Sequence, residues 1–519
     1  MRVPTRLGAV GAAAVLCVLL TGPVAVLDEE SYLEIAGALP WGRPYDWWRP
    51  WQPAGAAPAA DTYLFAHPPL FLWWVKAWAS RANVSPAALL PLKIAAALPW
   101  AMLYGWAAGR LAVRFVPDAP RVAAALALSS PVVLLGLQRG LMPDLMVAAL
   151  SAAAVACVVE DRPGQAWWAP AGLLLGAAAS TKYPALLLFP VIALHGWARG
   201  RVPWAALALA GALWLGVEGF LASRYGRPHL WEVLHTADTI GRGSFFGRLC
   251  GVAARLGFVL LPLPFLARRW AVLWLAAVLF ALAVVALGAP SGHPGAGRLA
   301  LLAFALPGAL LFVVIGLHVQ IAAPHGRAGA DALLLAAWAL AVVLGVLFGH
   351  NFAAPRYLLP AALPLALMVA RLWSRSPRGR ALLGATAAAQ LSLGLALSHA
   401  ERRAAEAADA AALAALAEAP APRAFAGEWA FRHRMRAAGV PFWSGGPLPA
   451  GTTLILAENS APPAAPAGWV GRPGPAFGRH PLRLVDPPAG VGFYGETLGP
   501  LPLGRGDGPL EQVTLWTAP

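Results

Sequence analysis

Long apolar runs separated by short polar connections recur along residues 1–398. Their repeat of roughly 20 residues suits helices that cross a bilayer core about 30 Å thick. The pattern therefore predicts a mainly α, polytopic membrane part with about thirteen spans, several of them short and joined by tight turns. The predicted spans are 7–27, 86–108, 121–138, 143–159, 167–181, 183–198, 203–222, 251–267, 270–288, 299–317, 331–348, 357–373 and 381–398.

Two connections, 28–85 and 223–250, are much longer than the others. The first opens with the acidic sequence DEESYLEIA, from Asp28 to Ala36, and returns to apolar sequence through HPPL, from His67 to Leu70. It is rich in tryptophan, which favours the boundary between water and lipid. We predict that residues 28–85 form one or two helices lying along the membrane surface.

Arginines concentrate in the short connections on one side of the predicted membrane part, and this predicts the orientation of the chain. Short cytoplasmic loops are enriched in lysine and arginine. The rule places the N-terminus in the cytoplasm, and an odd number of spans then places the C-terminus outside. Ten of the fourteen acidic residues before Ala400 fall on the outer side in this topology. The arginines that set the orientation are Arg110, Arg114, Arg199, Arg201, Arg268, Arg269 and those from Arg371 to Arg380.

The composition changes at residues 399–519, where apolar runs of spanning length end. Residues 401–419 predict an amphipathic helix, and Arg423 to Phe425 a short strand. Residues 427–439 predict a second helix that ends at Gly439, because glycine favours helix ends. Residues 452–457 (TTLILA) predict a buried strand. We therefore expect a small α/β or α+β domain on the outer face.

Composition excludes two broad classes of protein. The chain is 59% hydrophobic and 12% charged, whereas soluble domains carry about 25% charged residues. The formal net charge of +15 does not indicate nucleic-acid binding, because the arginines lie between apolar segments rather than along one polar face. Cys17, Cys157 and Cys250 lie in or beside apolar segments without metal-binding spacing, so neither a disulfide framework nor a zinc site is expected.

The N-terminal segment has two readings. Arg2 and Arg6 before an apolar stretch are compatible with a cleaved signal peptide. The stretch is long enough to span a membrane, and no clear cleavage site precedes Asp28. We favour an uncleaved first helix.

Three acidic residues on the outer side are candidates for chemistry. Asp28 and Glu29 directly follow the first span, where partial loss of solvent makes a carboxylate usable as a general base. The alternative is a solvated cluster beside the membrane. Asp144 follows Pro143 in a tight turn, where an aspartate commonly caps a helix. Alternatively, Asp144 helps to hold a metal or sugar hydroxyls.

Outer cations and one histidine form a second candidate set. Lys182 and Arg356, the latter followed by Tyr357, lie in turns that the short-loop rule leaves uncharged. A lysine can snorkel to the interface, but cations gathered at this depth favour an anionic ligand such as a lipid phosphate. His67 precedes two prolines that turn the chain and is a candidate phosphate contact or metal ligand. Weaker candidates of the cationic kind are Lys93, Arg139 and Arg224.

These motifs, taken in order, resemble the GT-C superfamily of glycosyltransferases that use polyprenyl-phosphate sugars. The nearest likeness is to bacterial protein O-mannosyltransferase and lipid A aminoarabinose transferase relatives, the family 39-like group. The motifs that carry the resemblance are DEESYLEIA from Asp28, HPPL from His67, LMPDLM around Asp144, STKYP around Lys182 and RYLLPAALP from Arg356.

The resemblance implies a fold and a reaction. The expected fold is the GT-C fold with 1–398 as the membrane domain and 399–519 as an extracytoplasmic domain. Asp28 would be the catalytic base, with Glu29 beside it, in a single inverting displacement. Lys182, Arg356 and His67 would hold the departing phosphate. The site as a whole would include Tyr357 and Asp144.

The implied partners are a polyprenyl-phosphate-linked sugar donor, a lipid, protein or polysaccharide acceptor, and membrane lipids, without nucleic acid. The implied location is the bacterial cytoplasmic membrane. No cofactor is assigned with certainty, and a divalent metal is left open, with Glu29, Asp144 and His67 as its possible ligands. The chain departs from aminoarabinose transferases at Ala66 and His67, where they carry a Glu-Lys pair, and at Ser31, where they carry arginine. Their donor and acceptor are therefore not transferred to this chain.

Two rival classes remain. A transporter or lipid-linked sugar flippase normally places ionisable residues or broken helices near the bilayer midplane. Here no acidic residue occurs from Arg162 to Val217 or from Ile240 to Ala330, and the charges gather at one interface. A non-enzymatic membrane scaffold leaves that gathering unexplained.

The orientation yields the first testable prediction. We expect a membrane-impermeant thiol reagent to label cysteines introduced within residues 28–85 from outside intact cells, because this connection follows a first span that starts in the cytoplasm. A cysteine introduced beside Arg199 should react only after permeabilisation. The reverse pattern of labelling would contradict the proposed topology.

Overall fold

The computed structural model describes residues 2–45, 67–79, 86–159, 167–239, 244–263, 271–289, 295–322, 327–350, 352–443, 445–460, 468–486, 489–495 and 498–518. Asp46, Asp61, Glu160, Asp161, Arg268 and Arg269, which entered the topology prediction, lie outside these residues.

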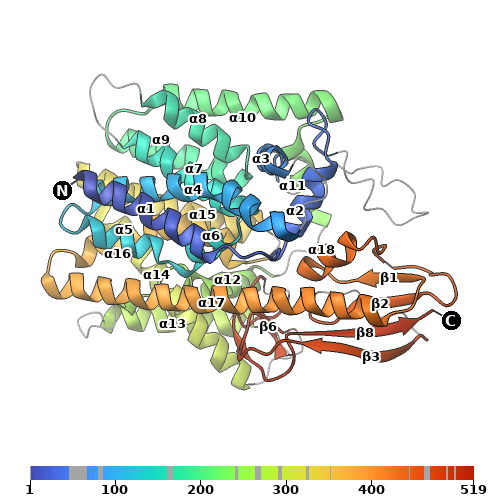
Figure 1. Ribbon diagram of the computed structural model, residues 1–519. Coiled ribbons are helices and arrows are strands. Elements are labelled where there is room, and N and C mark those ends of the chain that lie inside the picture. The colour runs from blue at the N-terminus through green and yellow to red at the C-terminus, as the bar shows by residue number, and fades with distance from the viewer. Residues whose placement is uncertain are drawn as a thin grey trace.

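Helices make up most of the described chain. Figure 1 shows them packed side by side, with the N-terminus at one end of the bundle and the strands at the other. The helices of the apolar part are α1 (Arg2–Leu20), α2 (Glu29–Ala38), α3 (Leu70–Ala79), α4 (Pro86–Phe115), α5 (Pro120–Leu128), α6 (Pro131–Gln138), α7 (Pro143–Val158), α8 (Trp168–Ala179), η2 (Tyr183–Leu187), α9 (Leu188–Ala198), α10 (Trp204–Tyr225), α11 (His229–Thr239), α12 (Phe245–Leu256), α13 (Ala271–Gly288), α14 (Gly295–Ala322), α15 (Arg327–Gly349), η5 (Pro355–Ala361), α16 (Ala362–Trp373) and α17 (Pro377–Glu418).

Seven described helices are long and apolar enough to cross a membrane, or eight if the bent pair of α5 and α6 is one span. Four shorter apolar segments, including α7 and α8, accompany them. The chain is therefore a multi-pass membrane protein, as predicted, with fewer full-length spans than the thirteen expected. The predicted span 251–267 differs most, since α12 ends at Leu256 and Pro262 follows shortly.

Exposed side chains agree with a membrane location. Helix α13 presents exposed Val272, Leu275 and Leu279, as expected of a surface that faces lipid. Exposed tryptophans form two groups, which is the arrangement typical of the two membrane interfaces. The first group comprises Trp168, Trp197 and Trp204, which lie at the start of α8, the end of α9 and the start of α10. The second group comprises Trp41, Trp78 and Trp231, which lie on α3 and α11 and just after α2.

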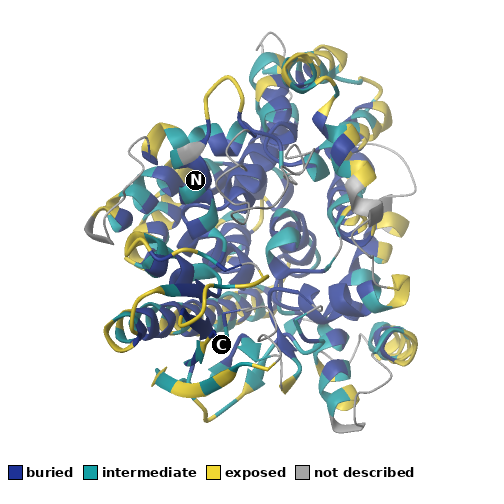
Figure 2. Cartoon of the chain, turned by 90° about the vertical axis from the view of Figure 1, so that its right-hand side faces the viewer, coloured by how far each residue is buried: buried dark blue, intermediate teal, exposed yellow. Residues whose placement is uncertain are grey.

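Helix α7 forms the centre of the bundle. Its residues from Pro143 to Cys157 are all buried. Figure 2 shows buried segments, in dark blue, running through the interior of the molecule. The helix packs against α4, α8 and η5. The residues at its N-terminal end are therefore held by several neighbours, which matters for Asp144.

The first long connection, predicted to form one or two helices, contains α2 and α3, which pack against each other. The second long connection contains α11. Figure 1 shows α2, α3 and α11 at the end of the bundle that faces the strands. Of these helices, α2 contacts α18 of the C-terminal part.

Helix α17 runs for 42 residues without a break. It joins the last predicted span to the amphipathic helix predicted at 401–419, so the change of composition at residue 399 falls inside one helix. Helix α18 (Trp429–Ala437) also matches the prediction, and Gly439 after it has a φ of +72°.

The C-terminal part contains a four-stranded sheet with strand order β1-β2-β8-β3. Strands β1 (Arg423–Ala426) and β2 (Thr453–Ala457) are parallel, whereas β8 (Glu511–Thr517) runs antiparallel to both β2 and β3 (Val470–Phe477). All five residues of β2 are buried, as its unbroken apolar run predicts. Two small hairpin sheets complete this part, β4 (Leu482–Arg483) with β7 (Gly504–Arg505) and β5 (Val485–Asp486) with β6 (Val491–Gly492).

The close contact of α1 with α4 depends on glycine. A Cβ atom at Gly105 would lie 2.6 Å from the Ala9 carbonyl oxygen and 2.9 Å from the Ala13 Cβ, whereas a Cβ atom at Gly11 would meet nothing within 4 Å. Small residues let membrane helices approach in this way.

We expect Gly105→Ala to destabilise the protein by about 1–3 kcal/mol, because the added methyl forces α1 and α4 apart. Gly11→Ala is the matched control and should be neutral or slightly stabilising, since alanine favours helix. Thermal unfolding of both purified variants in detergent measures the difference. Equal unfolding temperatures would contradict this account of the contact.

Candidate active site

Asp28 lies at the point where the first long connection begins. It is the N-terminal cap residue of α2, and 38% of its side chain is exposed. Arg356, in the first turn of η5, donates from Nη1 to Asp28 Oδ2 at 2.8 Å. The ion pair thus joins two predicted site residues 328 positions apart in the chain.

Asp144 and Lys182 form a second ion pair in the same region. Asp144 occupies the first turn of α7, and Lys182, in the turn after α8, donates from Nζ to its Oδ1 at 2.6 Å. The Lys182 ammonium also lies 4.8 Å from the centre of the Tyr357 ring. Four residues predicted from four separate motifs therefore meet at one place.

A pocket opens beside these charges. Asp144, Lys182, Arg356 and Tyr357 line it together with His350 and apolar residues of α7, α9 and α15. The His350 ring stacks on Tyr357 with ring centres 4.0 Å apart. Burial lowers the pKa of His350 to about 3, and the positive charge of Lys182 acts in the same direction. His350 is therefore uncharged at neutral pH.

Arg356 retains an unused donor. Its Nη2 donates to the Tyr357 hydroxyl at 3.2 Å, but its buried Nε has no hydrogen-bond partner among the described residues. A buried guanidinium N–H without an acceptor is costly. This donor is thus available to an anion that enters the pocket.

Glu29 occupies a different environment from Asp28. It is fully buried, and Lys93 Nζ lies 2.6 Å from its Oε2. Its two oxygens also accept hydrogen bonds from the backbone amides of Val26 and Leu141, at 2.9 and 3.0 Å. These contacts anchor the chain just before α2 to α4 and to the turn that leads into α7.

The Tyr32 ring lies between His67 and the charged residues Asp28 and Arg356. Its ring stacks on Tyr32 with centres 6.5 Å apart, and its carbonyl accepts a hydrogen bond from the Tyr45 hydroxyl at 2.8 Å. Burial raises the pKa of Tyr32 well above its usual value, and the nearby Asp28 carboxylate adds to this shift.

The possible metal ligands do not form a site. Within the described part of the chain, no three histidine, cysteine or acidic side chains are grouped so as to hold a metal ion. Glu29 already has three partners, and Asp144 is paired with Lys182. Glu29, Asp144 and His67 therefore do not fit a shared metal.

Arg139 has a partner that the sequence did not indicate. It forms a bidentate pair with Glu401 of α17, in which Nε lies 3.1 Å from both carboxylate oxygens. The Tyr494 hydroxyl donates to the same carboxylate at 2.6 Å, and the Arg139 guanidinium lies over the Tyr494 ring. Of this group, the sequence had signalled only Arg139, as a weaker cationic candidate.

Helix α18 contacts α2 through a buried arginine. Arg432 Nε lies 3.4 Å from Glu30 and 3.8 Å from Glu34, and its Nη1 lies 2.7 Å from Glu428. Burial raises the pKa of Glu30, although the Arg432 charge opposes this shift. The C-terminal part is thereby attached directly to the helix that Asp28 caps.

A hydrogen-bonded cluster around Tyr183 lies next to Lys182 in the chain. The Tyr183 hydroxyl is 2.6 Å from both Glu218 Oε1 and His229 Nδ1. Tyr45 stacks on His229 at 4.6 Å. Because these residues come from η2, α10, α11 and the first long connection, both long connections are tied to the turn that carries Lys182.

Part of the chain matches a known protein family. Residues 65–199 match the family model described as alpha-(1->6)-mannopyranosyltransferase, N-terminal domain. This segment contains His67, Asp144 and Lys182. The match supports glycosyltransferase activity, which the ordered motifs also predict. No curated protein sequence matches the chain significantly.

Two solved structures are similar to the chain at low identity. ArnT from Cupriavidus metallidurans bound to undecaprenyl phosphate is 16% identical with a TM-score of 0.39, and the match covers 87% of this chain and 93% of that one. AglB from Archaeoglobus fulgidus, in complex with an inhibitory peptide and a dolichol-phosphate, is 15% identical with a TM-score of 0.39 over 79% and 58% of the two chains.

Mutation of Glu29 should destabilise the protein. We expect Glu29→Gln to lower stability by about 3–5 kcal/mol, because it leaves the buried Lys93 charge unpaired. The double variant Glu29→Gln/Lys93→Met should recover part of this loss. Glu406→Gln, which breaks an exposed pair with Arg403, is the control and should cost at most about 1 kcal/mol.

Thermal unfolding of the purified variants measures these effects. A Glu29→Gln variant that unfolds at the temperature of the Glu406→Gln variant would mean that the buried pair does not anchor this region.

Proposed function

We propose that this chain transfers a sugar from a polyprenyl-phosphate donor to an acceptor hydroxyl, with inversion, at the outer face of the bacterial cytoplasmic membrane. The observation that supports the proposal is that Asp144, Lys182 and Arg356, from three separate turns, line one pocket, and that Asp28 pairs with Arg356 at its side. The family-model match, named for a mannopyranosyltransferase, makes a mannosyl donor the first to test.

Asp28 is the proposed base. It is the partly exposed acid of the cluster, whereas Glu29 and Asp144 are buried and paired. Arg356 holds the carboxylate in one orientation, and the second oxygen remains available to an acceptor hydroxyl. Because a phosphate ester already has a stable anionic leaving group, deprotonating the acceptor is the main acid-base task of the protein. In this scheme Glu29 is a positioning residue that fixes the chain beside the base.

The donor phosphate is proposed to occupy the pocket beside Lys182 and Arg356. Departure of the sugar adds negative charge to the phosphate, and preorganised cations stabilise that charge in the transition state. Arg356 supplies its unused Nε–H, and Lys182 supplies an ammonium held by Asp144 and the Tyr357 ring. The neutral His350 adds no further charge. His67 supports this site through Tyr32 in our scheme, rather than by direct contact with phosphate.

We expect Asp28→Asn to reduce sugar transfer by about 10²–10⁴-fold, because the amide cannot accept the hydroxyl proton. Its unfolding temperature should stay near that of the parent chain, since Asp28 is partly exposed. Asp118→Asn replaces an exposed acid in the connection between α4 and α5 and should leave transfer unchanged. The assay follows release of radiolabelled mannose from polyprenyl-phosphate mannose in lipid nanodiscs.

Sugar transfer by Asp28→Asn at the parental rate would remove Asp28 from the role of base. Movement of intact lipid-linked sugar across vesicles, without any release of sugar, would favour a flippase instead.

A further inference from the structure

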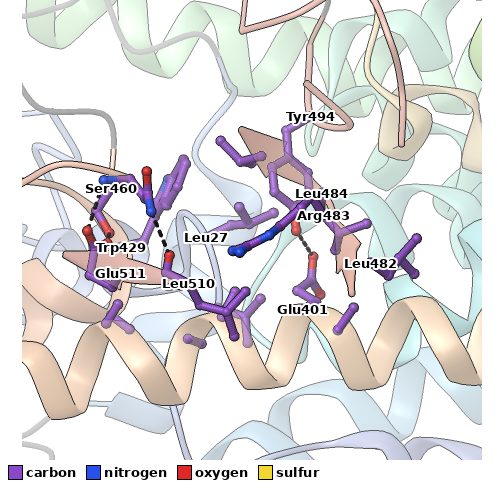
Figure 3. A pocket seen from close by; sticks show the side chains of 18 residues that line it. Leu27, Glu401, Trp429, Ser460, Leu482, Arg483, Leu484, Tyr494, Leu510 and Glu511 are labelled. Carbon is purple, nitrogen blue, oxygen red and sulfur yellow. Dashed lines mark hydrogen bonds between the residues drawn. The ribbon is translucent and has the colours of Figure 1, made fainter. Parts of the chain in front are cut away.

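A second pocket lies between the membrane part and the C-terminal part (Figure 3). Its floor is one face of α17, made of Ala400, Ala404, Ala405 and Ala408. These positions follow each other at helical spacing, and their small side chains leave the space above them open. The strand side of the pocket is formed by residues 482–485 and by Leu510 and Glu511.

The two positive-φ residues other than glycine in the described chain both line this pocket. Leu27 has a φ of +50° and Trp429 a φ of +61°. A positive φ is a genuine outlier for bulky side chains, and such strain gathers at binding and catalytic sites. The two residues are about 400 positions apart in sequence, so a shared local cause does not explain the coincidence.

The lining combines a flat apolar ring with polar groups at two ends. Trp429 is half-buried and meets the Tyr494 ring edge to face at 6.2 Å. Figure 3 shows Ser460 and Glu511 at one end, Glu401 and Tyr494 at the other, and Leu27 between them. Ser460 donates to Glu511 at 2.5 Å, and its hydroxyl oxygen keeps lone pairs for an incoming donor.

The polar ends also have adaptable hydrogen-bonding capacity. Burial raises the pKa of Glu511 to about 7, so this carboxyl can both donate and accept hydrogen bonds near neutral pH. An aromatic face flanked by hydroxyl and carboxyl oxygens, with the Arg483 guanidinium also in the lining, matches the apolar face and hydroxyl edges of a sugar ring.

The pocket adjoins the proposed catalytic base along the chain. Leu27 lines this pocket, and the next residue, Asp28, pairs with Arg356 of the donor-side pocket. Glu401 lines the second pocket while its partner Arg139 lies on the side of Asp144. Asp28 is thus the chain neighbour of a residue that lines one pocket and the ion-pair partner of a residue that lines the other.

The floor of the pocket lies beyond the apolar stretch of α17. The last predicted span ends at residue 398, and the floor begins at Ala400. A ligand in this pocket is therefore approached from the aqueous side rather than from within the lipid.

We propose that this pocket binds the acceptor, that the acceptor is a neutral oligosaccharide, and that Trp429 and the alanine face of α17 are its recognition surface. This inference rests on the proposed function, because it makes the bound saccharide the hydroxyl donor that Asp28 activates.

The test measures binding separately from transfer. Full-length protein in lipid nanodiscs is titrated calorimetrically with neutral di- to tetrasaccharides of mannose, glucose and galactose. We expect at least one series to bind saturably. Ala404→Leu should weaken binding by at least about tenfold, because the side chain fills the pocket. Ala417→Leu, an exposed position on the same helix, is the matched control and should bind as the parent does.

Trp429→Gly provides a second variant that does not depend on tolerance of a larger side chain. Glycine adopts a φ of +61° without strain, so relief of strain offsets part of the lost contact with Tyr494. We expect loss of saccharide binding of at least about tenfold, with a smaller change in unfolding temperature than Trp429→Ala produces.

The outcomes separate this inference from the proposed function. Asp28→Asn should bind the saccharide as the parent does, while its sugar transfer falls by about 10²–10⁴-fold. Normal transfer by Asp28→Asn together with lost binding by Ala404→Leu would reject Asp28 as the base and still support the pocket as the saccharide site. The inference is overturned if no oligosaccharide binds, if Ala404→Leu and Trp429→Gly bind normally, or if only a membrane glycolipid accepts sugar and Ala404→Leu leaves that reaction intact.

Discussion

The buried pair between Glu29 and Lys93 is the constraint on which the geometry of the site depends. A carboxylate and an ammonium removed from water are stable only when each neutralises the other and the remaining hydrogen-bonding capacity is used. Two backbone amides and the Val24 carbonyl complete that requirement. Because Glu29 is fixed in this way, the preceding Asp28 is held at the surface of the bundle, where Arg356 reaches it.

The C-terminal part is attached to this anchored region at several independent points. Arg432 reaches the acids of α2, and Glu401 with Tyr494 surrounds Arg139. Arg255, fully buried in α12, donates to the carbonyl oxygens of Phe493 and Gly499. All three attachments use arginine, whose fixed fork of donors satisfies several oxygens at once. The strands and the membrane helices therefore form one continuous packed body around the two pockets.

Much of the fold follows from patterns that lie within short stretches of sequence. Apolar length predicts the spans, tryptophan content and acidity predict α2 and α3, and the run TTLILA predicts the buried strand β2. The bend of 58° between α5 and α6 was missed, although Pro131 follows two serines there. The predicted span 251–267 failed because apolar composition alone does not distinguish a spanning helix from a short buried one.

Part of the candidate site was predictable, because charged side chains near lipid are costly and therefore indicate a function. This argument found Asp28, Asp144, Lys182 and Arg356 without showing which pairs they form. The partners of Arg139 and Lys93 were not predictable, because Glu401 is 262 residues from Arg139 and no local pattern joins them. The strained Leu27 and Trp429 are invisible in sequence, since neither residue type signals a positive φ.

The unbroken course of α17 has a geometric consequence. At 1.5 Å per residue, its 42 residues extend about 63 Å, roughly twice the thickness of the hydrocarbon layer. One continuous helix thus carries the alanine face, from Ala400 to Ala408, at a fixed distance from its own apolar stretch. In the proposed acceptor pocket, a saccharide would have to present its reactive hydroxyl at the level of that face.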